Sequence, residues 1–150
     1  MKLQILGSGT STGVPEIGCN CAVCTSNDAR DKRLRTSALL HTDNEHILID
    51  CGPDFREQML RLDTFHKLDA VLLTHEHYDH VGGIDDLRPF CKFGEIPVVA
   101  DNYAATHLKE RMPYCFGENL YPGVPRIYLQ VATPGDAFKI GETTIFPIQV

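Results

Sequence analysis

The stretch LLTHEHYDHVGG, from Leu72 to Gly83, places three histidines and one aspartate within six residues, directly behind an apolar run. The continuous apolar character of that run, LDAVLLT, predicts a strand that is buried on both faces. Alternate side chains of an extended segment lie on one side, so we expect His75, His77 and Asp79 to project together. His80 breaks this alternation where the glycines begin, and it is therefore expected to reach a second position.

This group of ligand-type side chains favours a metal site. Neutral imidazole and carboxylate groups suit Zn²⁺, Fe²⁺ or Mn²⁺. A lone histidine is more often a structural residue, but four ligand-type side chains at the end of a buried strand argue against that role here. The segment can offer the imidazoles of His75 and His77 to one cation. It can offer the pair of Asp79 and His80 to a neighbouring cation.

The same segment resembles the metal-binding signature of the metallo-β-lactamase superfamily, His-x-His-x-Asp-His. The resemblance implies that these four residues bind two metal ions flanking a shared water, and that Asp79 also takes part in catalysis. LIDCG (Leu48–Gly52) is similar to the family's strand-end motif, which implies that Asp50 orients a metal-bound histidine. Asp50 could also cap the helix predicted to begin near Pro53, and both roles can hold together.

A second resemblance lies in GSGTSTGVPEIGCNCAVC, which ends at Cys24. Its Gly-Val-Pro step, followed by Gly-Cys-x-Cys-x-x-Cys, is similar to the phosphoribosyl cyclic phosphate phosphodiesterases and their relatives. In that subgroup three cysteines and a later histidine hold a structural zinc, which implies this role for Cys19, Cys21 and Cys24. Thiolates at such spacing fit a tetrahedral zinc that would pin a long loop. The alternative, a Cys21–Cys24 redox pair, leaves Cys19 without a role.

Other features carry weaker signals. GSGTSTG lacks the lysine and the spacing of a Walker phosphate loop, and its expected use is a tight turn that brings backbone close to the metal site. Arg33 and Arg35 could meet a phosphate, but a solvated basic face is the expected role. Three isolated cysteines are expected to be buried as small apolar residues: Cys51, Cys91 and Cys115. Four histidines belong to no motif and receive no role: His41, His46, His66 and His107.

The order of strand-type and helix-type segments predicts a layered α/β fold in one domain. Strands are predicted for KLQILG, TSALLHT, HILIDCG, LDAVLLT, IPVVA, RIYLQVA, AFKI and TTIFPIQV. Helices are predicted for PDFREQMLRL, with Pro53 in its first turn, and for NYAATHLKERM, with Asn102 as its N-cap. The family resemblance implies a four-layer αββα sandwich, of which residues 1–150 form the N-terminal half or slightly more. We therefore expect a chain truncated at its C-terminus, whose remaining ligands would follow Val150.

Composition narrows the classes of partner. The net charge of −6 argues against broad binding to nucleic acid or anionic membranes. We find neither a signal peptide nor an apolar stretch of membrane-spanning length, so a cytoplasmic location is expected. Clustered cysteines in that compartment are typically metal ligands or redox groups.

The expected function is that of a metal-dependent hydrolase, and more narrowly of a phosphodiesterase acting on a small phosphodiester such as a cyclic one. Its expected cofactors are two catalytic zinc ions, with Mn²⁺ or Fe²⁺ as substitutes, and one structural zinc. Two alternatives stay open: a nuclease related to tRNA 3′-end processing enzymes, and a zinc-binding protein without catalysis. We expect the 150-residue chain alone to be inactive, with bare apolar faces that favour a homodimer.

Overall fold

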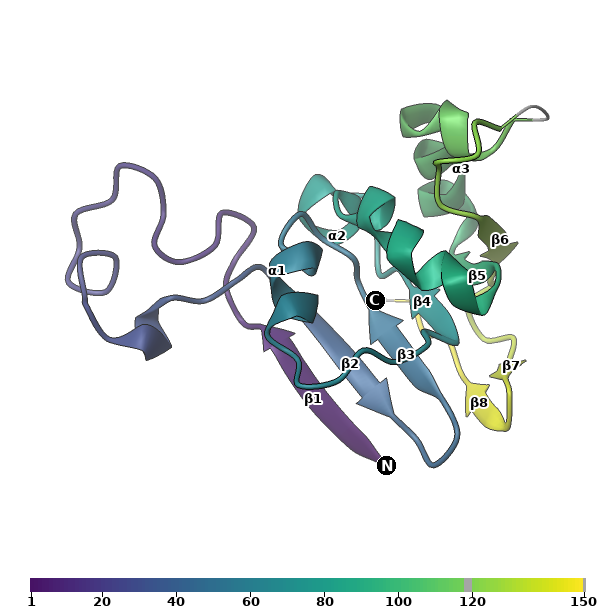
Figure 1. Ribbon diagram of the computed structural model, residues 1–150, viewed down its shortest axis with the longest axis horizontal. Coiled ribbons are helices and arrows are strands. Elements are labelled where there is room, and N and C mark those ends of the chain that lie inside the picture. The colour runs from purple at the N-terminus through teal and green to yellow at the C-terminus, as the bar shows by residue number, and fades with distance from the viewer. Residues whose placement is uncertain (118–119, 150) are drawn as a thin grey trace.

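The computed structural model describes residues 1–117 and 120–149. Its main element is a six-stranded sheet with the order β1-β2-β3-β4-β5-β6 (Figure 1). The strands are β1 (Lys2–Gly7), β2 (Ser37–His41), β3 (His46–Ile49), β4 (Ala70–Leu72), β5 (Ile96–Ala100) and β6 (Ile127–Val131). Strand β2 pairs antiparallel with both β1 and β3, whereas β3 to β6 pair in parallel.

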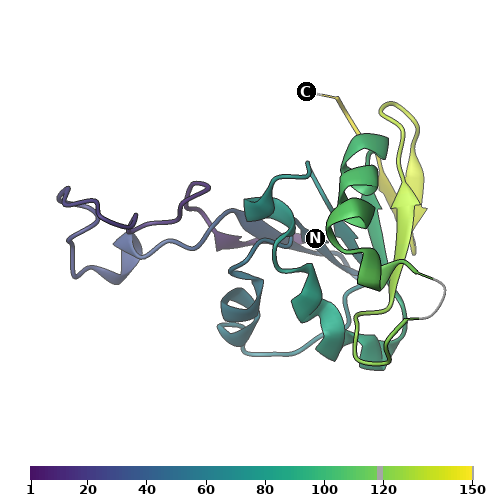
Figure 2. The ribbon, with the colours of Figure 1, turned by 90° about the horizontal axis from the view of Figure 1, so that it is seen from above.

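Helical segments cover one face of this sheet (Figures 1 and 2). They are α1 (Phe55–Leu60), α2 (Tyr78–Val81), the 3-10 helix η2 (Ile84–Phe93) and α3 (Asn102–Arg111). Each parallel strand pair is joined through such a segment, because parallel pairing requires a crossover. Phe55, Leu87 and Leu108 of the helices pack in one apolar core with the buried sheet residues Leu48 and Val71. Short 3-10 turns occupy the loops at η1 (Ala29–Asp31) and η3 (Pro113–Cys115).

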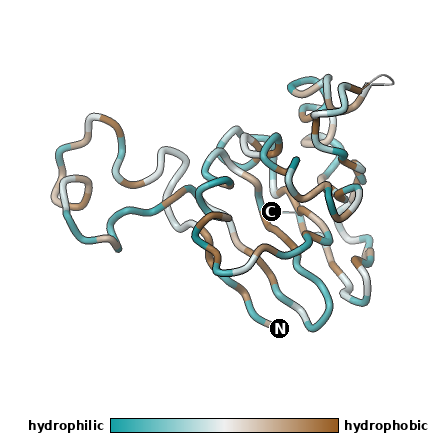
Figure 3. The backbone as a smooth tube through the Cα atoms, viewed as in Figure 1, coloured by the Kyte–Doolittle hydropathy of each residue, from teal (hydrophilic) through white to brown (hydrophobic). Residues whose placement is uncertain are grey.

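A two-stranded hairpin covers the centre of the opposite face. It consists of β7 (Phe138–Ile140) and β8 (Thr143–Ile145), and its Ile140 packs against Ile47 and Ala70. The order of layers is therefore helices, six-stranded sheet, hairpin, which confirms the predicted layered α/β architecture. Figure 3 shows that hydrophobic residues run along the central strands. In the described part of the chain, no helix is long and apolar enough to cross a membrane.

Two details of the helix termini differ from the predictions. Helix α1 begins at Phe55, so Pro53 lies ahead of it and not in its first turn. The N-cap of α3 is Asp101, whose carboxylate accepts a hydrogen bond from the backbone N–H of Ala104 at 2.7 Å. A carboxylate satisfies a free amide of the first turn, and Asn102 is therefore the first helical residue.

The isolated cysteines are buried as predicted: Cys51, Cys91 and Cys115.

Residues 8–36 leave the body as a long arm (Figures 1 and 2). Val14 and Arg33 exchange backbone hydrogen bonds of 2.8 and 2.9 Å, and they close the neck of the arm. The glycine-rich stretch allows this neck to form: a Cβ at Gly7 would lie 2.0 Å from the carbonyl oxygen of Arg35. The glycine therefore allows close contact with the returning segment of the arm at Arg35, whereas the predicted contact was with the metal site. Beyond the neck, residues 15–32 include no buried side chain.

Arg35 anchors the arm to the body, which corrects its predicted role in a solvated basic face. Its guanidinium pairs with Asp54 at 2.8 Å and donates to the carbonyl oxygen of Ser11 at 2.8 Å. Its backbone N–H also donates to Asp54 at 2.7 Å. Arg33 is exposed.

Candidate metal centre

The ligand-type residues meet at one edge of the sheet. Strands β3 and β4 are parallel neighbours, so the residues that follow their carboxyl ends are brought together. Asp50 follows β3, and His75 follows β4. The ring centroid of His75 lies 4.7 Å from that of His77 and 4.0 Å from that of His80. Because α2 begins at Tyr78, the extended alternation ends at His77, and Asp79 and His80 lie on a helical turn.

Backbone contacts hold the two strand-end loops against each other. The N–H of Cys51 donates to the carbonyl oxygen of His80 at 2.8 Å, and the N–H of Gly83 donates to that of Cys51 at 2.9 Å. A Cβ at Gly52 would lie 2.0 Å from the carbonyl oxygen of Asp79. A Cβ at Gly83 would lie equally close, 2.0 Å from the carbonyl oxygen of Gly52. Glycine at both positions is what permits this approach.

Asp50 is the buried partner of the histidine segment. Its side chain accepts a hydrogen bond from the Thr74 backbone N–H at 2.8 Å and from the Thr74 hydroxyl at 2.9 and 3.0 Å. Its Oδ2 lies 2.7 Å from Nδ1 of His80. The carboxylate is thus committed to Thr74 and His80, and the predicted alternative role as a helix cap is wrong. The N-cap position of α1 belongs to Asp54.

This contact sets the direction in which His80 presents its second nitrogen. With Nδ1–H donating to Asp50, Nε2 keeps the lone pair that a metal needs. That Nε2 lies 3.1 Å from Oδ2 of Asp79. Two donor atoms bound to one ion at about 2.1 Å stand at about this separation. The pair of His80 and Asp79 therefore fits a shared ion.

The donors in this segment converge as pairs. In residues 1–117 and 120–149, three ligand atoms mutually within 4.8 Å occur only in the cysteine cluster. His75 with His77, and Asp79 with His80, thus each offer two donors and need others to complete a coordination shell. The chemistry of these donors fits a divalent transition metal, and their metal-binding role stays a prediction.

Two residues at this edge were not singled out from the sequence. Thr74 bridges Asp50 to the histidines, because its hydroxyl lies 3.0 Å from Nδ1 of His75. Its place immediately before His75 is a usable sequence signal. Arg111, from the last turn of α3, donates a hydrogen bond to the carbonyl oxygen of Glu76 inside the segment. No local sequence pattern predicts the contact of Arg111 with this segment, because Arg111 lies on a separate helix.

A cleft of about 880 Å³ opens beside His75. It follows the carboxyl ends of β4, β5 and β6, where ligands usually bind in open α/β sheets. Polar and aromatic side chains share its lining, which includes Thr74, His75, Asp101, Tyr103, Thr133 and Phe138.

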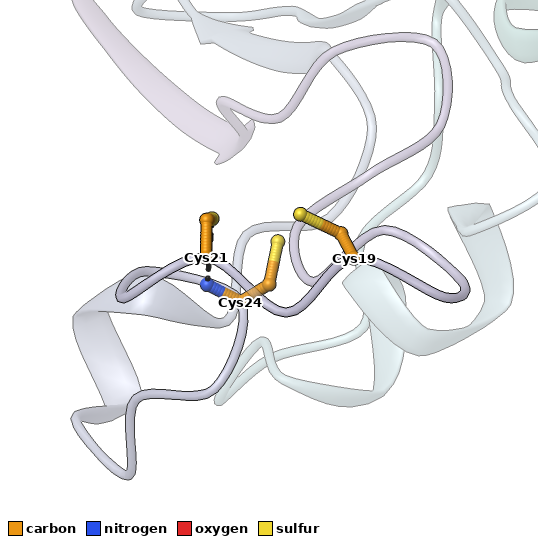
Figure 4. A group of neighbouring side chains, drawn as sticks. All are labelled: Cys19, Cys21 and Cys24. Carbon is orange, nitrogen blue, oxygen red and sulfur yellow. Dashed lines mark hydrogen bonds between the residues drawn. The ribbon is translucent and has the colours of Figure 1, made fainter.

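The cysteines form a second and separate group in the arm. The sulfur atoms of Cys19, Cys21 and Cys24 lie within 4.8 Å of one another, and Figure 4 shows them gathered in one loop. Three thiolates on one tetrahedral zinc stand about 3.8 Å apart, given Zn–S bonds of about 2.3 Å. Backbone N–H groups point at two of the sulfurs, from Cys24 to Cys21 at 3.5 Å and from Glu16 to Cys24 at 3.4 Å. The donor set fits one zinc ion.

The protonation chemistry of the cluster agrees with this fit. The backbone N–H of Cys24 and the thiols of Cys19 and Cys24 stabilise the thiolate of Cys21, and they lower its pKa to about 7. A metal ligand must be deprotonated, so the lowered pKa of Cys21 reduces the cost of metal binding at this thiol.

Comparison with known proteins places the chain in a family. Residues 45–150 match the model of the Beta-lactamase superfamily domain. A crystal structure described as a new diphosphatase from the PhnP family superposes with a TM-score of 0.83 and 39% identity, over 95% of this chain and 54% of that one. Zn²⁺-bound PqqB from Methylobacterium extorquens shares the fold, with a TM-score of 0.81 and 23% identity, over 100% of this chain and 56% of that one.

A curated relative from Porphyromonas gingivalis carries the name octanoyltransferase. It is 50% identical over 151 residues, which cover 100% of this chain and 30% of that protein. The chain thus spans about half of the solved structures and less than a third of this relative. The family match, the identity with the PhnP-family structure and the strand order agree. The chain therefore belongs to the β-lactamase superfamily, with part of the metallo-β-lactamase fold and similarity to its PhnP-like subgroup.

Proposed function

We propose that this chain supplies one metal-ligand segment and part of the substrate cleft of a metal-dependent phosphodiesterase. The observation that carries this proposal is the contact between Asp50 and His80. It fixes one imidazole so that its free nitrogen faces Asp79, 3.1 Å away. A buried carboxylate behind a histidine is the arrangement that orients metal ligands.

We assign His75 and His77 to one ion and Asp79 and His80 to a second ion. Zinc suits these donors, and Mn²⁺ or Fe²⁺ are possible substitutes. When bound, such a pair of ions supplies a nucleophile from water at neutral pH and offsets charge on a phosphoryl group.

The protein's own residues position this chemistry. Asp50 and Thr74 hold the histidine rings, and Arg111 holds the backbone between His75 and His77 through the Glu76 carbonyl. Substrate is expected in the cleft beside His75. Each pair supplies two donors, so each ion needs further ligands to complete its coordination shell.

The proposed substrate is a small phosphodiester, with cyclic diesters included. Support comes from the 39% identity to a structure described as a diphosphatase from the PhnP family. Acyl transfer is not carried over from the Porphyromonas gingivalis relative, because most of that protein lies outside the match. For the cysteine cluster we propose a structural zinc that holds the arm together.

The test is turnover of bis-p-nitrophenyl phosphate by the longest available form of the protein, with Zn²⁺ or Mn²⁺ added. We expect His77→Ala to lower turnover by at least about tenfold, on the scale seen for disturbed metal sites. His107→Ala is the control and should change the rate far less, because His107 lies on α3 outside the histidine segment, where its ring contacts Tyr103 and not a predicted ligand.

Other outcomes would overturn the proposal. Equal losses of turnover in His77→Ala and His107→Ala would show that the histidine segment is not the reactive site. Cleavage of RNA with a steep salt dependence would establish a nuclease instead. Tightly bound zinc without turnover of any phosphodiester would leave a zinc-binding protein without catalysis.

A further inference from the structure

Three histidines form a cluster at the end of the sheet opposite to the candidate metal centre. His41 is the last residue of β2, and His46 is the first residue of β3. His66 belongs to the segment between α1 and β4, which crosses in front of β2 and β3 in Figure 1. We call these three residues the histidine cluster. Its members come from three separate segments, so no local motif predicts it.

The rings of the histidine cluster stand close together. His41 and His46 are direct partners across the antiparallel pair, with ring centroids 5.1 Å apart and ring planes at 85°. The ring centroid of His66 lies 4.4 Å from that of His46, with the two rings stacked at 11°, and 6.5 Å from that of His41. Two imidazoles on one tetrahedral ion have centroids about 5 Å apart, given Zn–N bonds of about 2.0 Å. The His41–His46 spacing of 5.1 Å matches that value, whereas the stacked rings of His46 and His66 must turn relative to each other before both can bind one ion.

Hydrogen bonds hold the cluster and leave donor nitrogens free. Nε2 of His41 lies 3.1 Å from Oε1 of Gln4, so an Nε2–H donor leaves the lone pair on Nδ1. The backbone of His46 exchanges two hydrogen bonds with Asp69, at 2.8 and 2.9 Å, which ties the segment carrying His66 to β3. Among the described residues, the ring nitrogens of His46 and His66 have no hydrogen-bond partner.

Burial and nearby charges favour the neutral form of His41 and His46. Burial, and then the nearby His46, Lys2 and His66, lower the pKa of His41. Burial and His66 also lower the pKa of His46, against the opposing effect of Asp69. Asp69 is itself paired with Lys67 at 2.8 Å. Neutral imidazole is the form that binds a metal, so the lowered pKa values of His41 and His46 reduce the cost of deprotonating these two rings.

We propose that His41, His46 and His66 bind one divalent transition-metal ion of the kind that imidazole prefers, such as Zn²⁺, Ni²⁺ or Cu²⁺. Their nitrogens do not yet all lie within 4.8 Å in the described structure. Binding therefore requires a rotation that the exposed ring of His66 can make. A bound ion would link the β2–β3 hairpin to the segment between α1 and β4. This site is independent of the proposed phosphodiesterase centre.

The test is a Zn²⁺ titration of the protein with its resident metals in place, followed by the ¹H–¹³C NMR signals of the histidine rings. Single substitutions to glutamine assign the signals of the three rings. We expect these signals to shift together and to saturate at one added equivalent. His66→Gln should weaken that binding by at least about tenfold. Because His66 is exposed, its replacement leaves the core intact and keeps the result interpretable.

The matched control is His107→Gln, which removes a histidine outside the histidine cluster and should leave the added equivalent bound. The inference is wrong if His66→Gln binds zinc as tightly as the parent protein, or if the three rings respond at different zinc concentrations. Loss of phosphodiesterase activity does not enter this test, so the two proposals fail independently.

Discussion

Asp50 has a backbone φ of 59°, in the left-handed region that few residues other than glycine adopt. Its N–H continues the parallel ladder by donating to the carbonyl oxygen of Leu72 at 2.9 Å. The turn that follows places the side chain under the histidine segment, where it is only 2% exposed. Strained backbone of this kind persists where the surrounding structure demands it. Here the hydrogen bonds of Asp50 with Thr74 and His80 hold its backbone in this conformation.

At this scale we predict the effect of Asp50→Asn. The amide keeps the shape of the carboxylate, but it loses the charge and turns one acceptor into a donor that opposes either the Thr74 N–H or the His80 Nδ1–H. Metal affinity and turnover should each fall by at least about tenfold, measured by chelator competition and by phosphodiester hydrolysis. Asp43→Asn is the control, because that side chain is 96% exposed. Unchanged metal affinity in Asp50→Asn would contradict the role given to Asp50.

At the scale of elements, the arm has little of its own to hold it in shape. Ile17 is 101% exposed and Val23 is 40% exposed, so burial of apolar surface contributes little beyond the neck. The neck itself rests on backbone hydrogen bonds and on the ion pair of Arg35 with Asp54. A metal cross-link among the cysteines is therefore the main candidate for ordering residues 15–32.

We predict that replacing Cys19, Cys21 and Cys24 together with serine removes one zinc per chain and loosens the arm. Elemental analysis should show the loss, and proteolysis within residues 15–32 should become at least about tenfold faster. The thermal stability of the whole chain should also decrease, but by less, because the apolar core lies outside the arm. Asn20→Ser in the same loop serves as the control. A zinc content unaffected by the triple substitution would disprove the assignment.

A second element depends on one buried carboxylate. Glu45, only 5% exposed, accepts hydrogen bonds from the Thr42 hydroxyl, from the Glu142 N–H at 2.7 Å and from the Thr143 hydroxyl at 2.8 Å. It thereby docks the β7–β8 turn on the β2–β3 turn. Gly141, with a φ of 56°, leaves the room for it, since a Cβ there would lie 2.2 Å from Oε1 of Glu45.

These hydrogen bonds, led by that of Thr42, lower the pKa of Glu45 below its usual 4.5. A depressed carboxyl pKa stabilises the folded form at pH values above the unfolded pKa, and this stabilisation is lost as the pH falls through the folded pKa. We predict that amide exchange in β7 and β8, corrected for intrinsic rates, accelerates below about pH 4. Glu45→Gln should show faster exchange already at neutral pH, without that acid step. The exposed Glu95→Gln should behave as the parent, and an acid step that survives in Glu45→Gln would refute the docking role.

At the scale of the whole molecule, the hairpin covers only the centre of its face of the sheet. On the edge strand β1, Leu3 is 54% exposed and Ile5 is 60% exposed, and both pair in register with β2 residues of that face. On the other edge, Tyr128 of β6 is 56% exposed. Apolar surface left bare at a strand edge promotes pairing with another chain.

We predict that a protein consisting of residues 1–150 alone associates with itself. Light scattering should give a mass that rises with concentration above the 16.7 kDa of one chain. The double substitution Leu3→Lys and Ile5→Lys should reduce the association, because charge on an edge strand opposes pairing. Leu60→Lys, at a residue of α1 that is 65% exposed on the helical side, should not. A stable monomer that holds two metals and turns over a phosphodiester would overturn this expectation.

The sequence by itself determined the elements and the ligand types. Apolar runs such as IPVVA predicted buried strands, and the crowding of ligand-type residues from His75 to His80 predicted where a metal would be sought, because both are local patterns. The spacing of three cysteines likewise predicted a cluster that the structure brings within 4.8 Å. Helix termini were less predictable: Asp101 and Asn102 are both good caps, and the path of the chain decided between them.

Only the tertiary structure decided which distant residues meet. The partner of Asp50 is His80, thirty residues away, because β3 and β4 are parallel neighbours whose carboxyl ends share an edge. Arg111 reaches the Glu76 carbonyl only through the placement of α3. The histidine cluster assembles from three segments that the sheet and its crossover bring together. Local sequence sets local conformation, whereas contacts across long separations depend on strand order, which short-range patterns do not encode.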